Sequence, residues 1–233
     1  MFGAIYAQDG WPRSRKRIKK GMLATFVSLA AALFVLLLTA SPAQATDSSI
    51  TGVALDGDFV VYTEGTVDQT SVPDDGLAGV IKWRQDALND TNVKLQYGNT
   101  YVTVREYLAK IGVSESDYLN PKWSNALERI AVQRAIENRD YSRIHIRLTG
   151  GSCWTATYNG YSSNHEVLAW AADVSGAITM WSWEKDDYIK EVNGQPHGVT
   201  GHYLFLIDPQ YKEYGFARLS RNAGGRSSFL FPV

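Results

Sequence analysis

The stretch "NPKWSNALERIAVQRAIENRD" (residues 120–140), followed at once by "YSRIHIRL" (residues 141–148), decides the fold that the sequence predicts. Its first part favours an amphipathic helix, because Asn120 can cap the start and Pro121 suits the first turn. The apolar side chains that share one helical face are Trp123, Leu127, Ile130, Ala131 and Ala135. This apolar face must pack against another element.

The pattern changes after Asp140. The segment "RIHIRL" (residues 143–148) alternates and contains β-branched residues, which favours a strand. Alternation predicts Ile144 and Ile146 on one face of this strand, and His145 and Arg147 on the other. His145 then points away from the isoleucines, either as a filler or as a ligand at the strand end.

The remaining elements complete the predicted fold class. Helical periodicity predicts helices over residues 77–88, 102–112 and 177–190, with Gly112 closing the second one in the left-handed conformation. The apolar run "HYLFLIDPQ" (residues 202–210) predicts a buried strand, and "EYGFARL" (residues 213–219) is its expected hairpin partner. Helices first and strands later, with a central helix between strands, predict an α+β sandwich.

The two ends of the chain are expected to lie outside the folded domain. Basic "RSRKRIKK", an apolar run and "SPAQA" predict that residues 1–45 are a signal peptide cleaved after Ala45. The apolar run is long enough to span a bilayer, so an uncleaved anchor is the alternative, and either way the rest is exported. Residues 46–76 are interpreted as a linker or extension, and residues 220–233 as a tail, docked or disordered.

Charge and cysteine content exclude several classes of protein. Residues 46–233 carry 17 basic and 23 acidic side chains, a net charge of −6 with no basic run. Such a surface argues against nucleic acid and anionic lipid as partners. Cys153 is the only cysteine, so no disulfide forms within the chain, and a small buried hydrophobe is a better interpretation than a reactive thiol.

Any metal site must be assembled from separate elements. The chain has four histidines and no HExxH or CxxC motif. Glu184 lies beside Trp181 on a predicted helix, and Glu166 lies between His165 and an apolar run, where an ionised carboxylate needs a partner. A lone histidine in a strand is more often structural than a ligand, and a lone glutamate is more often solvated. Periodicity alone therefore does not define a site.

The order of several motifs resembles the CAP superfamily, which comprises cysteine-rich secretory proteins, antigen 5 and pathogenesis-related proteins. These motifs are "ALERIAVQRAIE", "HIRLTGGSC", a glutamate before an apolar stretch, "WSWEKDDY" and "TGHYLFLIDPQYKEYGFA" with Gly215. The resemblance covers residues 77–219 and is closest to bacterial secreted members. It implies a three-layer α-β-α sandwich for this CAP domain.

The resemblance also implies a cleft lined by two histidines and two glutamates that can hold a divalent metal. His145, Glu166, Glu184 and His202 match these positions. The family's "GENIA" reads "NHEVLA" here, which makes Glu166 the weakest match and His165 a candidate substitute. Imidazoles and one or two carboxylates suit zinc better than calcium or magnesium.

Three functions are compatible with this site. The favoured hypothesis is an exported binding module at the cell envelope or in the extracellular space, with a metal and a small-molecule, lipid, peptide or protein ligand. The alternative is a metal-dependent hydrolase of peptide or cell-wall substrates, with a zinc-bound water and Glu184 or Glu166 as the base. In the third, the four side chains only hold the domain together. Any membrane contact would come from an uncleaved N-terminal anchor.

Overall fold

The structure is a computed structural model that describes residues 3–5, 51–53, 61–63, 66–141, 144–148, 150–220 and 228–232. The predicted signal or anchor segment and its cleavage site therefore lie outside the described residues, apart from Gly3–Ile5. None of the described helices combines the length and apolar character that a bilayer crossing requires.

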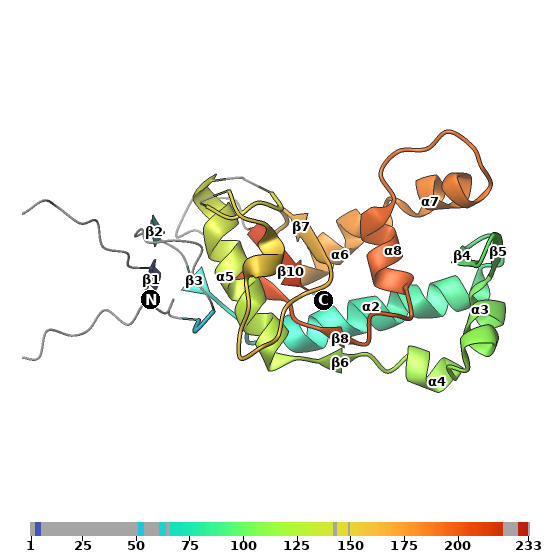
Figure 1. Cartoon of the computed structure of the whole chain (residues 1–233), viewed down its shortest axis with the longest axis horizontal. Helices are drawn as coiled ribbons and strands as arrows, with labels where there is room; N and C mark the ends of the chain where they lie inside the picture. The colour runs from blue at the N-terminus through green and yellow to red at the C-terminus, as the bar shows by residue number, and fades with distance from the viewer. Residues whose placement is uncertain are drawn as a thin grey trace, which may run out of the picture.

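The structure contains both helices and strands, and the fold class is α+β (Figure 1). The helices are α2 (Val72–Asn89), α3 (Val104–Ile111), α4 (Glu115–Tyr118), α5 (Asn125–Tyr141), α6 (Val174–Ser182), α7 (Lys185–Val192) and α8 (Gly201–Ile207), with a 3₁₀ turn at Cys153–Thr155. The strands are β1 (Gly3–Ile5), β2 (Val61–Thr63), β3 (Thr66–Val67), β4 (Lys94–Tyr97), β5 (Thr100–Thr103), β6 (Lys122–Trp123), β7 (Glu166–Ala169), β8 (Glu213–Tyr214), β9 (Ala217–Ser220) and β10 (Ser228–Pro232).

The largest sheet has four strands in the order β3-β9-β10-β7, and every pair in it is antiparallel. Helix α5 packs against β9 and β10, and α6 contacts β7. Helix α2 runs along α6 and α8 to the hairpin β4–β5 and α3, which lie at the opposite end of the molecule from α5 (Figure 1). The sheet and α5 therefore form one end of the fold, and the hairpin forms the other.

Two predicted helices are confirmed. Helix α2 contains the predicted residues 77–88 and begins earlier, with a proline in its first turn. A Cβ on Gly76 would lie 2.1 Å from a ring carbon of Phe216, so glycine lets α2 approach the end of the sheet. Helix α3 starts with a capping box between Thr103 and Glu106 and ends at Gly112, whose φ is 69°.

The central helix is confirmed as well, but it begins at Asn125 and not beside Asn120. Trp123 lies before the helix, in β6, which pairs in parallel with β8. Ser124 lies at the helix start, where its carbonyl accepts from the Glu128 amide at 2.9 Å. The chain first pairs with β8 and only then turns into the helix, which local capping signals did not predict.

The predicted strand over "RIHIRL" is wrong. Residues 144–148 form a turn with a single bridge between Ile146 and Ser152, and Ile144 has a left-handed φ of 54°. Ile144 and Ile146 are about half exposed, whereas Arg147 is fully buried. Burial of the arginine, paired with Glu137, overrides the apolar alternation.

The predicted strand over residues 202–210 is also wrong, because the apolar run forms α8. Its expected hairpin with residues 213–219 is absent: β8 pairs with β6, and β9 pairs with β3 and β10. The predicted helix over residues 177–190 is present as two helices, α6 and α7, which are interrupted at Trp183 and Glu184.

Parts of the predicted extension and tail contact the domain. In the extension, Thr51 donates a hydrogen bond to Gln133 at 2.9 Å, and Val53 packs against Leu127 and Ile130 of α5. In the tail, Ser228–Pro232 forms β10 between β7 and β9.

Gly215 allows β8 and β9 to approach α5 very closely, since a Cβ there would lie 2.2 Å from the Glu128 amide nitrogen. We expect Gly215→Ala to lower the free energy of unfolding by about 2 kcal/mol or more, because backbone must move to admit the methyl group. Gly201→Ala is the matched control: its Cβ would have no atom within 4 Å, and φ is not left-handed. Urea unfolding of both variants measures the difference, and equal stabilities would contradict this packing argument.

Candidate functional site

A buried ion network occupies the space between α5, β7 and the turn at residues 144–148. Arg134 and Arg147 are fully buried, and Glu137 and Glu166 are almost so. Arg134 donates to Glu166 at 2.8 Å and to Glu137 at 2.5 Å, and Arg147 donates to Glu137 at 2.6 Å. Two positive and two negative charges compensate one another, which is the condition under which buried charges are tolerated.

This network fixes the position of His145. Arg134 Nη2 donates to the Ile144 carbonyl at 2.7 Å and so supports the left-handed residue before the histidine. On the other side, the Cys153 amide donates to the His145 carbonyl at 3.2 Å. The imidazole Nδ1 lies 3.0 Å from Glu166 Oε1, while 46% of the side chain remains exposed. His145 is therefore held at its inner nitrogen and open to solvent on the outside.

A second histidine–glutamate pair forms where α6, α7 and α8 meet. Glu184, at the interruption between α6 and α7, accepts from His202 Nδ1 at 2.6 Å. Its other oxygen accepts from the amides of His202 and Tyr203 at 2.9 and 3.2 Å, in the first turn of α8. The carboxylate thus caps a helix and orients an imidazole at the same time. The Trp181 ring stacks 6.5 Å from that of His202.

His165 lies near both pairs. Its Nδ1 is 3.0 Å from the Tyr211 hydroxyl, and its ring stacks on Phe205 with 5.5 Å between the centroids. Burial lowers the pKa of His165, and the charges of His202 and His145 lower it further. Because both act on His165 electrostatically, all three imidazoles belong to one region of the molecule. The ring of His165 is engaged in packing, which makes it a weaker substitute ligand than the sequence indicated.

The predicted residues form two His–Glu pairs, and Cys153, which sequence reasoning did not assign to the site, lies close to one of them. Among the described residues, one group of His, Cys, Asp or Glu brings at least three ligand atoms within 4.8 Å of one another: His145, Cys153 and Glu166. His202 and Glu184 are not in this group. The only sequence signal for Cys153 was its place eight residues after His145, beyond a glycine pair.

The donor types of this group fit a zinc ion, but their surroundings do not favour it. Imidazole nitrogen, thiolate sulfur and carboxylate oxygen are all zinc ligands. Both oxygens of Glu166, however, already accept hydrogen bonds from Arg134, at 2.8 and 3.2 Å. Burial raises the pKa of the Cys153 thiol to about 11; the negative charge of Glu166 raises it as well, and Arg134 opposes this. A cation here would compete with a guanidinium and a bound proton.

Comparison with known protein families supports the resemblance. Residues 114–231 match the profile of the family described as "CAP: Cysteine-rich secretory protein family". The chain belongs to the CAP family. The match includes both His–Glu pairs and Cys153, and it leaves α2, β4, β5 and α3 outside. Neither a curated protein nor a solved structure matches the chain.

Substitution of Arg134 should destabilise this CAP domain far more than substitution of an exposed arginine. We expect Arg134→Met to lower the free energy of unfolding by about 3–5 kcal/mol, because Glu166 and Glu137 would keep buried charges without their shared partner. Arg105→Met is the control: Arg105 pairs with Glu115 in solvent, so its loss should cost below about 1 kcal/mol. Denaturant melts measure both, and similar losses would contradict the role assigned to the network.

The Cys153 thiol should resist alkylation. With its pKa at about 11, little thiolate is present at pH 8, and the side chain is buried. We expect iodoacetamide to label the folded chain at least about 100-fold more slowly than the urea-unfolded chain at pH 8, with the rate rising toward pH 11. Because the chain has one cysteine, mass spectrometry reads this site alone. Equal rates in both states would contradict the buried, protonated thiol.

Proposed function

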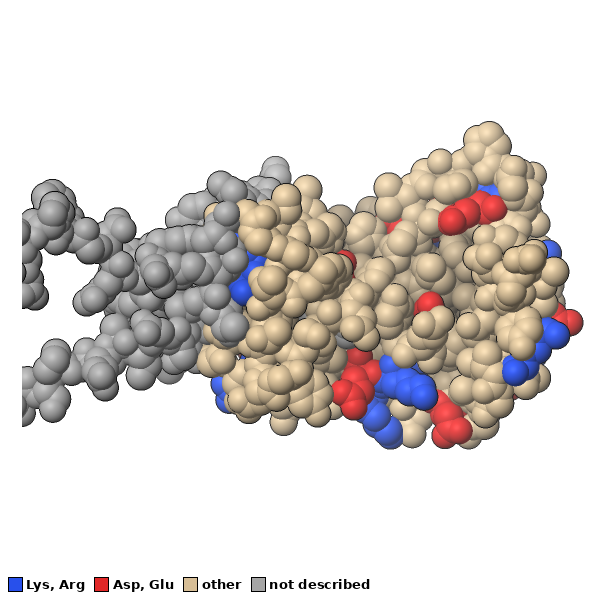
Figure 2. All heavy atoms as spheres, viewed as in Figure 1, with Lys and Arg blue, Asp and Glu red and all other residues tan. Residues whose placement is uncertain are grey.

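We propose that this CAP-domain protein is exported and acts at the cell envelope or outside the cell as a binding module, with a divalent metal, zinc, at its histidines. Support for export comes from the basic and apolar N-terminal segment and from the secretory family to which the chain belongs. Figure 2 adds that the described face bears mixed charges along β6, β8 and α4, with no continuous basic stripe. The net charge of −6 over residues 46–233 favours a ligand other than nucleic acid.

One observation carries the metal proposal. In both pairs, imidazole Nδ1 is hydrogen-bonded to a glutamate, at 3.0 Å for His145 and 2.6 Å for His202. Metal-binding histidines commonly give one ring nitrogen to a carboxylate and the other to the ion. We therefore assign His145 and His202 Nε2 as the ligand atoms, with Glu166 and Glu184 orienting the rings. Bound zinc would supply a positive centre for an anionic or carbonyl group of the ligand.

The same contacts favour a binding module over a hydrolase. A general base needs a free carboxylate oxygen within reach of the water that it deprotonates. Both oxygens of Glu184 are engaged by His202 and Tyr203, and both oxygens of Glu166 by Arg134. The three-layer α-β-α sandwich belongs to the proposal as well, supported by the contacts of α5 with β9 and β10 and of α6 with β7.

Zinc titration of the purified chain by calorimetry at pH 7 tests the metal assignment. We expect His145→Ala and His202→Ala each to weaken zinc binding by about 10- to 100-fold. His197→Ala is the matched control and should leave affinity unchanged, because this exposed histidine contacts only the Gly198 carbonyl among the described hydrogen bonds. Because histidine binds a metal only when its ligand nitrogen carries no proton, zinc affinity of the wild-type chain should fall as the pH is lowered.

Two results would contradict the metal assignment, and a third would contradict the function as a binding module. Unchanged affinity in both histidine variants, with lower melting temperatures, would leave the pairs a structural role. Loss of affinity in Cys153→Ser with none in His202→Ala would place the ion in the group of His145, Cys153 and Glu166. Chelator-sensitive cleavage of peptide or peptidoglycan that disappears in Glu184→Gln would identify a hydrolase.

A further inference from the structure

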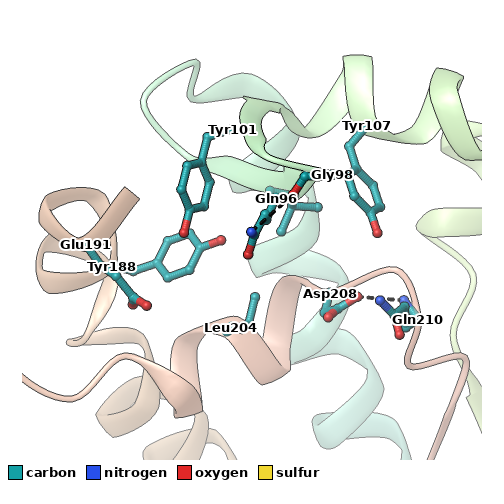
Figure 3. A pocket seen from close by; sticks show the side chains of 10 residues that line it. Gln96, Gly98, Tyr101, Tyr107, Tyr188, Glu191, Leu204, Asp208 and Gln210 are labelled. Atoms are coloured by element: carbon teal, nitrogen blue, oxygen red, sulfur yellow. Dashed lines mark hydrogen bonds between the residues drawn. The ribbon is translucent and has the colours of Figure 1, made fainter. Parts of the chain in front are cut away.

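A cavity of about 340 Å³ lies between the β4–β5 hairpin, α3, α7 and α8. Figure 3 shows three tyrosines on its upper and side walls, with a leucine and a carboxylate beneath them. The lining residues that matter are Tyr101, Tyr107, Tyr188, Glu191, Leu204 and Asp208. One wall comes from elements that precede the family match at residues 114–231, and the other from α7 and α8 within it. None of these residues belongs to the His–Glu pairs.

The tyrosines are built into the walls with their hydroxyls near the cavity. Tyr107 and Tyr188 are buried, whereas Tyr101 is 42% exposed and marks the opening. The Tyr188 hydroxyl donates to the Lys94 carbonyl at 2.6 Å, so the oxygen keeps its lone pairs for another donor. Figure 3 shows the hydroxyls of Tyr101 and Tyr107 directed toward α8. The walls therefore combine aromatic surface with hydrogen-bond acceptors.

Two carboxylates add negative charge to this lining. Glu191 Oε2 is buried and has no hydrogen-bond partner within the described part of the chain. Asp208 Oδ1 accepts a hydrogen bond from the backbone N–H of Gln210 at 2.8 Å. Burial raises the pKa of Asp208. Burial raises the pKa of Tyr188 most. The negative charge of Glu191 raises it further, and that of Asp208 has a smaller effect in the same direction. Both carboxylates thus lie within electrostatic reach of one hydroxyl.

Among the described residues, neither Glu191 nor Asp208 forms an ion pair with a lysine or arginine. No lysine or arginine is among the described residues that line the cavity. The charge of Arg84 lowers the pKa of Asp208. Its donors, however, are directed to the carbonyls of Leu206, Tyr118, Asp208 and Tyr211 and to the Tyr214 hydroxyl. A buried carboxylate oxygen without a partner costs free energy unless a ligand supplies the missing charge or donor.

We propose that this cavity binds a small organic cation carrying an alkylammonium group. The carboxylates of Glu191 and Asp208 supply the opposite charge, and the tyrosine rings supply faces that attract a cation and cover its alkyl groups. A bare metal ion suits the site less well, because calcium and magnesium need more oxygen ligands than two carboxylates provide. The site is independent of the metal proposed at the histidines.

Calorimetric titration of the full chain with choline, and with its neutral isostere 3,3-dimethyl-1-butanol, tests the proposal at pH 8. We expect choline to bind at least about 10-fold more tightly than the alcohol, because only choline carries the charge. Glu191→Gln and Asp208→Asn keep the side-chain shapes and should each weaken choline binding about fivefold or more. Tyr101→Leu, at the exposed rim, should weaken it without affecting the melting temperature.

Glu213→Gln is the matched control, since this exposed carboxylate in β8 does not line the cavity and its loss should leave choline binding unchanged. Equal affinity for choline and the alcohol would overturn the proposal, as would the absence of choline binding up to roughly 50 mM. Choline binding that survives all three cavity substitutions would place the cation elsewhere and overturn it as well. Melting curves of the variants show that each compared chain is folded.

Discussion

The guanidinium of Arg134 is the single group on which the arrangement around His145 depends. It extends from α5 and donates hydrogen bonds to Glu166 of β7, to Glu137 on its own helix and to the carbonyl of Ile144. A helix, a strand and a turn that are separate in the chain are thereby held at one buried point. Because that point has no solvent to replace a lost partner, its charges must be retained together. The exposed imidazole is a consequence of this buried arrangement.

Helix α8 is also held by charged side chains from other segments of the chain. Its first amides are capped by Glu184, and Arg84 donates to carbonyls at its C-terminal end, those of Leu206 and Asp208. An anion at the start and a cation at the end stabilise a helix through its dipole. The seven-residue helix is too short to be stable from propensity alone. Contacts from distant segments therefore decide that this apolar run is a helix.

The sequence predicted the helices that follow from local periodicity, but not the conformation of segments that are held by buried charged side chains. Helices α2, α3 and most of α5 follow from periodicity and, for α3, from Gly112. The strands expected around His145 and His202 are wrong, because alternation and apolar content carry no information about Arg147, Arg84 or Glu184 as partners. The two histidines and two glutamates could be matched by family resemblance, but their pairing could not. Arg134 and Cys153 could not be assigned to the site from the sequence.

A family described as cysteine-rich is represented here by a chain with one thiol, and that thiol is buried. With a single cysteine, the chain cannot form a disulfide between two of its own segments, so a reductant or oxidant has no such bond to break or make. Arg134 and Arg84 instead connect segments that are distant in the chain, through hydrogen bonds and ion pairs. These contacts do not depend on redox conditions. The folded domain should thus be as stable in a reducing medium as in an oxidising one.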